Sequence, residues 1–223
     1  MDVIEKALKE GRSTLSEHES KALLRAYDIP VTREKEAGDE QGFREAIQEM
    51  GFPLVIKACG PALSHKTESG LVYVDVRNEE EALAAFHEIM SKVKAEEGAT
   101  LVQEMVKGQR ELVVGLTRDP QFGPCVMFGL GGIFTEILKD ISFRVAPIEK
   151  RDALEMMQEI KGRKILEAVR GMPEADLDAL SQILITVGRI GLEQEKVKEI
   201  DINPVILKGG APVAVDALVV LTP

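Results

Sequence analysis

Short apolar runs alternate along the chain with segments whose apolar residues recur at helical spacing, a pattern that predicts a mixed α+β fold. Helices are predicted at five places: from a capping box at Ser16 and Glu19 to about Tyr27, over 42–50, from Asn78 to about Ala95, over 150–160 and over 174–191. Strands are predicted between them, over 53–57, 71–76, 101–106, 110–117, 125–128, 199–203 and 213–216.

Two of these strands, 101–106 and 110–117, are separated by Lys107-Gly108-Gln109, and this spacing predicts a hairpin with a tight turn. We expect a second lobe to begin here, with lobe 1 over 1–98 and lobe 2 over 99–223. At 223 residues the chain is long enough for one large domain or for two lobes of roughly 100 residues each, with a substantial core.

The composition is that of a globular protein, with 44% hydrophobic and 30% charged residues, and no apolar run long enough to span a membrane. A net charge of −10 disfavours binding to nucleic acid or to an anionic membrane. The N-terminus lacks the pattern of a signal peptide, so we expect a cytoplasmic protein. The two cysteines, Cys59 and Cys125, give neither a disulfide framework nor a zinc motif.

The stretch from Lys57 to Thr67 carries the strongest chemical signal, because two lysines and a histidine surround a glycine-proline break directly after an apolar strand. The ammonium groups of Lys57 and Lys66 suit phosphoryl oxygens, and the Thr67 hydroxyl completes their hydrogen bonding. The imidazole of His65 can accept a phosphoryl group at neutral pH. This pattern predicts a phosphate site, in which His65 is either a nucleophile or only a hydrogen-bond donor.

The same stretch nearly matches a P-loop, with His65 where the second glycine belongs. A P-loop must lead into a helix, whereas the β-branched run 71–76 predicts a strand. We therefore favour a strand, a phosphate-binding loop and a second strand.

Oxygen ligands gather near the C-terminus. Side chains alternate along a strand, so Asp201 and Asn203 share one face while Ile200 and Ile202 share the other. Asp216 stands alone in the apolar run that follows, where a carboxylate needs a partner. Asn203 and Asp216 are thus candidate ligands for a magnesium ion that completes its shell with water and nucleotide phosphates. The alternative is a hairpin whose polar residues are merely solvated.

Several motifs in combination resemble an ATP-grasp domain, in particular the β subunit of ADP-forming acyl-CoA synthetases, which are relatives of the succinyl-CoA synthetase β chain. They are the Lys57 strand, the His65-Lys66-Thr67 loop, the Gln103–Gly108 hinge, the stretch from Gly123-Pro124 to Phe134, Lys139–Arg144 and Asp201-Ile-Asn-Pro204. The resemblance extends from about Ser16 to Leu221.

The resemblance implies an ATP-grasp fold in which two α+β lobes hold ATP or ADP, with Mg²⁺, between them. It also implies that acyl-CoA, ADP and phosphate are converted to the carboxylic acid, ATP and CoA. In that scheme a separate CoA-binding α subunit, in an α2β2 assembly, forms a phosphohistidine, and His65 of this chain receives the phosphoryl group before ADP does.

Residue roles follow from the resemblance together with the chemistry of each side chain. Lys57 is expected on the α- and β-phosphates and Lys66 on the transferring group. Glu104, Met105 and Val106 are expected at the adenine, with Glu111 nearby, and Arg144 is expected to close on the phosphates or else to be a surface charge. Asp201 is expected to orient His65 or to serve as a third metal ligand. Two other functions stay open, a stand-alone ATP-grasp ligase without a histidine relay and a regulatory nucleotide-binding module.

Overall fold

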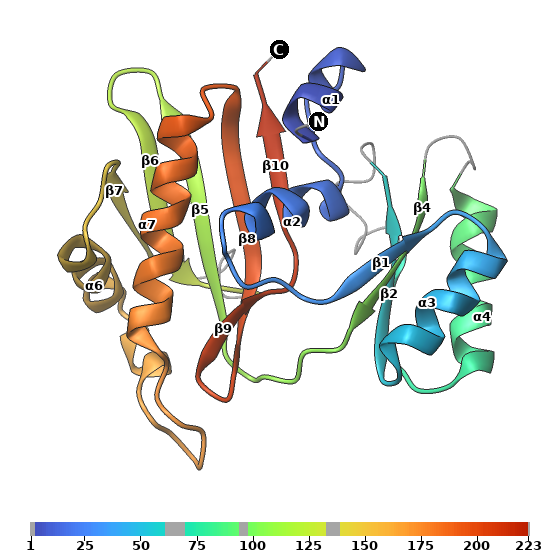
Figure 1. The fold of residues 1–223 in the computed structure, drawn as a ribbon. Helices are drawn as coiled ribbons and strands as arrows, with labels where there is room; N and C mark the ends of the chain where they lie inside the picture. The colour runs from blue at the N-terminus through green and yellow to red at the C-terminus, as the bar shows by residue number, and fades with distance from the viewer. Residues whose placement is uncertain (1–2, 61–69, 94–97, 133–138, 223) are drawn as a thin grey trace.

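The computed structural model describes residues 3–60, 70–93, 98–132 and 139–222, which build two antiparallel sheets flanked by helices (Figure 1). The predicted α+β class is confirmed. His65, Lys66 and Thr67 lie outside the described residues.

The first sheet has four strands in the order β1-β4-β2-β3, and α3 and α4 cover one of its faces. The strands are β1 (Glu34–Ala37), β2 (Leu54–Cys59), β3 (Val72–Val76) and β4 (Ala99–Glu104), and the helices are α3 (Glu40–Met50) and α4 (Glu79–Lys92). Phe43, Ile56 and Phe86 lie in the core between them. Alternation along β2 sends Leu54, Ile56 and Ala58 into that core and leaves Lys57 on the opposite face.

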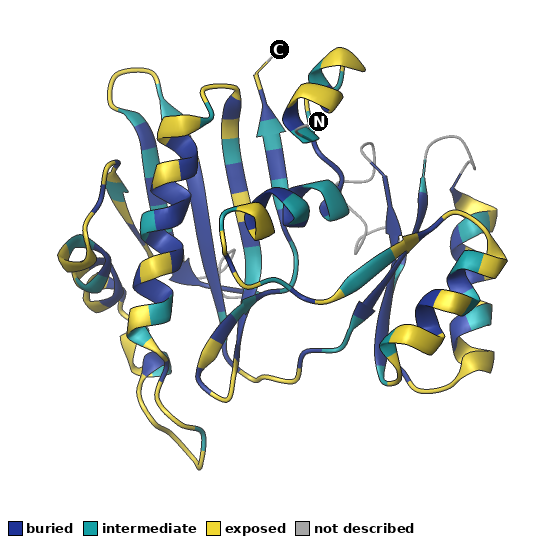
Figure 2. Cartoon of the chain, viewed as in Figure 1, coloured by how far each residue is buried: buried dark blue, intermediate teal, exposed yellow. Residues whose placement is uncertain are grey.

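The second sheet has six strands in the order β10-β8-β5-β6-β7, with β9 paired to β8. Its strands are β5 (Glu111–Asp119), β6 (Gly123–Leu130), β7 (Ile141–Val145), β8 (Val197–Lys208), β9 (Ala211–Ala214) and β10 (Leu218–Leu221). The flanking helices are α1 (Val3–Lys9), α2 (Glu17–Ala26), α6 (Lys150–Glu159), the 3₁₀ helix η1 (Arg163–Leu166) and α7 (Leu177–Glu193). The apolar side chains of α2 and α7 join one core with this sheet, and Figure 2 shows both helices buried on their inner faces.

The predicted helices form where local signals placed them. Ser16 Oγ accepts the Glu19 amide and Glu19 Oε2 accepts the Ser16 amide, which is the predicted capping box. Asn78 caps α4 as predicted. Gly51 ends α3 with a φ of 71°, a left-handed conformation that glycine adopts without strain.

The predicted hairpin of 101–106 with 110–117 is wrong. β4 pairs with β1 and β2 in the first sheet, whereas β5 pairs with β6 and β8 in the second. The chain between them crosses from one sheet to the other instead of turning back. Gly108 is close-packed there, because an added Cβ would lie 2.3 Å from Ile206 Cγ2. The division into lobes at residue 98 or 99 stays a prediction, although β4 itself belongs to the first sheet.

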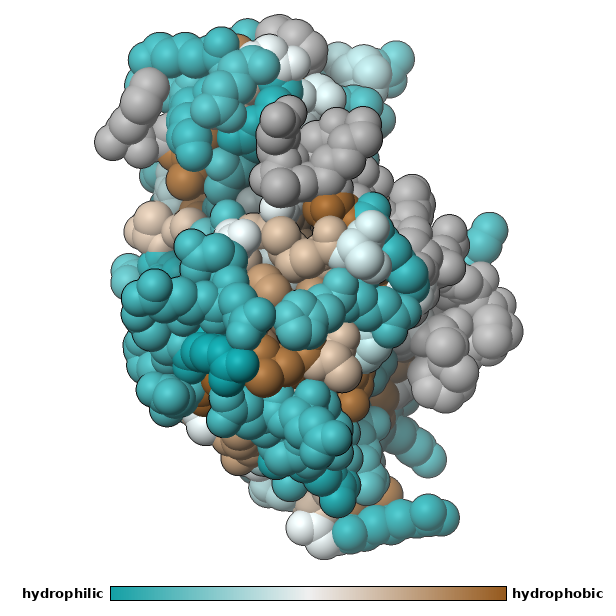
Figure 3. Space-filling model, turned by 90° about the vertical axis from the view of Figure 1, so that its right-hand side faces the viewer, coloured by the Kyte–Doolittle hydropathy of each residue, from teal (hydrophilic) through white to brown (hydrophobic). Residues whose placement is uncertain are grey.

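The two short strands predicted near the C-terminus also need correction. β8 is one strand of 12 residues that continues through Asn203 and Pro204, and its pairing with β5 shifts register opposite these two residues. Asp216 lies in the connection between β9 and β10 and not within a strand. The side of the molecule that carries the first sheet is mostly hydrophilic at its surface (Figure 3). Among the described helices, none is both long and apolar enough to cross a membrane.

Candidate functional site

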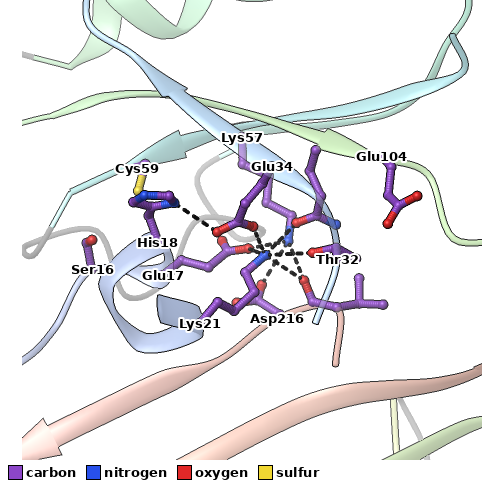
Figure 4. A network of polar contacts seen from close by, with 12 residues as sticks. Ser16, Glu17, His18, Lys21, Thr32, Glu34, Lys57, Cys59, Glu104 and Asp216 are labelled. Carbon is purple, nitrogen blue, oxygen red and sulfur yellow. Dashed lines mark hydrogen bonds and ion pairs between the residues drawn. The ribbon is translucent and has the colours of Figure 1, made fainter. Parts of the chain in front are cut away.

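Lys57 stands at the junction of the two sheets. It leaves β2 on the face turned away from α3 and α4, and only 4% of the residue is exposed. Its Nζ lies 2.8 Å from Glu17 Oε1 of α2 and 3.3 Å from Asp216 Oδ2, and it also donates to the Val215 carbonyl at 3.4 Å (Figure 4). Residues separated by up to 159 positions in the sequence therefore meet at this ammonium group.

Burial by itself would lower the pKa of Lys57, but the charges of Glu17 and Asp216 outweigh it and raise that pKa. The side chain therefore remains a cation at neutral pH. A cation that its neighbours hold in place on the face of a sheet is suited to binding phosphate.

Glu17 and Lys21, one turn apart on α2, also belong to this site, although the sequence reasoning gave them no role. Lys21 is fully buried, and its Nζ lies 2.8 Å from Glu17 Oε1 and in contact with Glu34 of β1. The same ammonium donates to the Gln103 Oε1 at 2.7 Å. One signal in the sequence could have revealed this pair. Glu17 and Lys21 carry opposite charges four residues apart, on the same face of α2 as Leu24, and all three residues are buried.

The two polar residues of β8 share one face, as the alternation predicted. Asp201 is exposed and Asn203 half-buried, while Ile200 and Ile202 are buried. Asn203 Oδ1 accepts a hydrogen bond from the Gly132 amide at 3.2 Å. Of the two expected metal ligands, Asn203 is therefore held by the glycine turn that follows β6 at Gly131 and Gly132, and Asp216 is held by Lys57.

Although Asp201 is exposed at the surface, neighbouring atoms displace part of the water around its carboxyl group. This partial burial, followed by the negative charge of Asp216, raises the pKa of Asp201 to about 6. Two carboxylates that repel each other are stabilised by a cation between them. Within the described residues no three His, Cys, Asp or Glu side chains form a group that could by itself hold a metal ion. The donor set of Asn203, Asp216 and Asp201 consists of hard oxygen ligands and fits Mg²⁺, which accepts few protein ligands and takes the rest from water and phosphate.

The residues expected at the adenine lie on the crossing between the sheets. Glu104 ends β4 and its carboxylate accepts the Arg33 amide at 2.9 Å. The Met105 amide donates to the Pro53 carbonyl at 3.4 Å, and Val106 is buried. Glu104 to Val106 therefore lie where the chain passes from the first sheet to the second, and their contact with adenine stays a prediction.

Glu111 begins β5 and faces the glycine turn after β6. Its carbonyl accepts the Gly131 amide at 2.9 Å. A Cβ on Gly132 would lie 2.1 Å from Glu111 Oε2, so the carboxylate passes directly over this glycine. Glu111 and Asn203 are thus brought to the same turn.

Arg144 is not brought together with these residues. Its guanidinium pairs with Glu159 of α6 at 2.5 Å and lies 3.8 Å from Glu155 of the same helix. The hydrogen bond with Glu159 is the largest cause of the raised pKa of Arg144. In this structure Arg144 holds β7 to α6, and its expected role at the phosphates stays a prediction.

The loop that contains His65 begins and ends in the first sheet. The Ala58 amide donates to the Leu71 carbonyl at 3.0 Å, and β2 and β3 pair antiparallel on either side of it. A strand therefore follows the loop, as predicted, and the P-loop alternative fails because it needs a helix there. The segment that contains His65 follows Cys59, the last residue of β2, which is also the strand that carries Lys57.

Comparison with known families and relatives agrees with this geometry. A family model described as an ATP-grasp domain matches residues 6–221. The chain is 45% identical to the β subunit of acetate-CoA ligase [ADP-forming] I from Pyrococcus furiosus, over 99% of this chain and 97% of the relative. It is 38% identical to the β subunit of the second such ligase from the same organism, with the same coverage of both chains.

Solved structures give the same result. Acetyl-coenzyme A synthetase 1 of Ca. Korarchaeum cryptofilum, in complex with coenzyme A and Ca-AMPCP, superposes with a TM-score of 0.94 at 44% identity over 99% of both chains. The same enzyme with coenzyme A and Mg-AMPPCP, whose phosphohistidine segment points towards the nucleotide-binding site, gives a TM-score of 0.87 at 43% identity over 99% of both chains.

Proposed function

This chain belongs to the ATP-grasp domain family, and from that premise we propose that it is the nucleotide-binding β subunit of an ADP-forming acetyl-CoA synthetase. The complete enzyme converts acetyl-CoA, ADP and phosphate to acetate, ATP and CoA. The observation that carries the proposal is the meeting of Lys57 with Asp216 at the junction of the two sheets, in a chain that matches such β subunits over nearly its whole length.

The binding step follows from the described geometry. ADP lies between the sheets with its adenine at 104–106 and its phosphates toward Lys57. Lys57 acts as a fixed point charge, since its ammonium is buried and already oriented. Asn203 and Asp216 hold the magnesium ion that supplies charge neutralisation at the phosphates. Glu111 lies beside the glycine turn, where it fixes the approach of the nucleotide.

The chemical step is a phosphoryl relay. The phosphohistidine of the CoA-binding partner gives its phosphoryl group to His65, and His65 then gives it to the β-phosphate of ADP. Lys66 and Thr67 bind the transferring oxygens, and Asp201 keeps the His65 imidazole oriented. The Korarchaeum synthetase, with its phosphohistidine segment turned to the nucleotide site, supports the first transfer.

This β subunit requires a CoA-binding α subunit, and we propose an α2β2 assembly located in the cytoplasm. Neither Cys59 nor Cys125 forms a disulfide, which suits a reducing compartment.

The test is phosphate labelling of the complex formed with the CoA-binding partner, using ATP labelled at the γ-phosphate. We expect label on His65 that survives base and is lost in acid, and we expect His65→Asn to abolish ATP synthesis. His87→Asn is the matched control, because His87 is an exposed histidine on α4 whose ring nitrogen pairs with the Glu40 carboxylate.

Two results would contradict the relay. If His65→Asn keeps most of the turnover, the chain acts as an ATP-grasp ligase that needs no histidine. If the assembled complex makes no ATP although the chain binds nucleotide, the chain is a regulatory module.

A further inference from the structure

Among the described residues, two carboxylates contact the Lys57 ammonium, and one of them is buried while the other is accessible to solvent. The Glu17 side chain has 1% of its area exposed, whereas that of Asp216 has 40%. Asp216 is also the residue that the proposed function assigns to magnesium. A carboxylate that coordinates a metal ion gives less of its charge to a neighbouring ammonium group. A carboxylate that stays in place when the magnesium nucleotide binds would therefore keep the Lys57 ammonium oriented while Asp216 turns to the metal.

Glu17 has the properties of that counter-ion. Its Oε1 lies 2.8 Å from Lys57 Nζ and 2.8 Å from Lys21 Nζ, so one carboxylate oxygen joins two ammonium groups (Figure 4). It is the first residue of α2, where a negative charge is favoured by the helix dipole. The Ser16 cap and the apolar side chains of α2 in the second core fix this position.

Lys21 holds Glu17 from the other side and ties the cluster to both sheets. Its Nζ reaches Gln103 Oε1 of β4 at 2.7 Å, Thr32 Oγ1 at 3.2 Å and the Val215 carbonyl at 3.1 Å. Val215 directly precedes Asp216. The Glu17–Lys21 pair therefore fixes Lys57 in the first sheet relative to the backbone that carries Asp216.

We propose that Glu17 is a positioning residue for nucleotide binding. It holds the Lys57 ammonium toward the phosphates while Asp216 leaves this lysine and binds the magnesium ion of the nucleotide. The inference rests on the proposed function and adds α2 to the nucleotide site, although this helix contains none of the phosphate or metal motifs.

The test compares two buried carboxylates of the same cluster in the assembled synthetase. Glu17→Gln removes one of the negative charges that touch Lys57 and leaves that of Asp216 in place. Glu34→Gln removes a charge that touches Lys21 and His18 but is not among the contacts of Lys57. Both variants are expected to melt at a lower temperature than the wild type, so loss of stability alone affects both.

The expected difference lies in KM. Lys57 binds phosphate in the ground state and in the transition state alike, so Glu17→Gln should raise KM for ADP about tenfold or more and change kcat less. Glu34→Gln should keep KM for ADP within about twofold of wild type. Equal KM values for wild type and Glu17→Gln would overturn the inference, and so would an equal rise in both variants.

If Glu17→Gln does not fold, the double variant Glu17→Gln/Lys21→Met removes one charge of each sign and leaves Lys57 with Asp216 alone. The same rise in KM is expected, and an unchanged KM refutes the positioning role. A wild-type complex without ADP-dependent activity would refute the proposed function and the inference with it, whereas an active wild type with an unaffected Glu17→Gln refutes only the inference.

Discussion

Lysine is rarely buried, because its ammonium group loses hydration that only close counter-ions replace. Lys21 and Lys57 meet this requirement with Glu17, Glu34 and Asp216. Sequence reasoning found Lys57, since a lysine in an apolar strand is conspicuous. It missed Glu17 and Lys21, because charged residues on a helix are expected on the solvated face, and only the three-dimensional structure shows that this face meets the first sheet.

The protonation of His18 makes the stability of this cluster depend on pH. Its Nδ1 lies 3.0 Å from Glu34 Oε1, and this hydrogen bond is the largest cause of its raised pKa; burial opposes the rise, Glu36 adds to it and Arg25 reduces it. Because the pKa of His18 is higher in the folded than in the unfolded protein, its hydrogen bond with Glu34 stabilises the fold fully at pH values below 6.5, the pKa of the unfolded state. This stabilisation is lost as the pH rises through the pKa of the folded state.

We therefore expect the free energy of unfolding to fall as the pH rises above 6.5, and we expect His18→Gln to remove about 1 kcal/mol or less of that fall, because the ring is partly exposed to solvent. Denaturant unfolding of both proteins across this range measures it. Parallel pH profiles for the two proteins would show that His18 contributes nothing.

At the scale of elements, local signals predicted the helices well and the strand partners poorly. Capping at Ser16 and Asn78 depends on neighbours within four residues, so it can be read from the sequence. The partner of β4 depends on contacts with β1 and β2, which lie far away in the chain. Gly108 looked like a turn residue, whereas the structure needs it for close packing against Ile206.

The glycine turn after β6 joins this strand to the candidate site through the hydrogen bond between Gly132 and Asn203. An added Cβ on Gly131 would lie 2.5 Å from the Leu112 carbonyl oxygen and 2.7 Å from the Leu112 nitrogen, both backbone atoms that cannot rotate away. Gly131→Ala should thus displace the turn that carries the Gly132–Asn203 hydrogen bond. We expect it to cost about 1–3 kcal/mol of stability and to weaken ADP binding.

Gly38→Ala is the matched control, because the added methyl group would have no atom within 4 Å and the glycine has no positive φ. Thermal unfolding and ADP titration of both variants measure the effect. If Gly131→Ala binds ADP as tightly as Gly38→Ala, the turn does not shape the nucleotide site.

At the scale of the whole molecule, the site depends on the two sheets being held together. Lys57 comes from the first sheet and Asp216 from the connection between β9 and β10 of the second sheet. Lys21 contacts β1, β4 and the Val215 carbonyl. The sequence supplied the residue types and the resemblance supplied their roles. Their convergence could not be predicted from spacing, because 159 positions separate Lys57 from Asp216.

The most direct test of the account is calorimetric titration of the full chain with ADP, with and without Mg²⁺. We expect Mg²⁺ to tighten ADP binding about tenfold or more in the wild type, and we expect Asp216→Asn, which keeps Glu17 beside Lys57, to lose this gain. The absence of binding at millimolar ADP with Mg²⁺ by folded wild-type protein would contradict the account, as would an undiminished Mg²⁺ effect in Asp216→Asn.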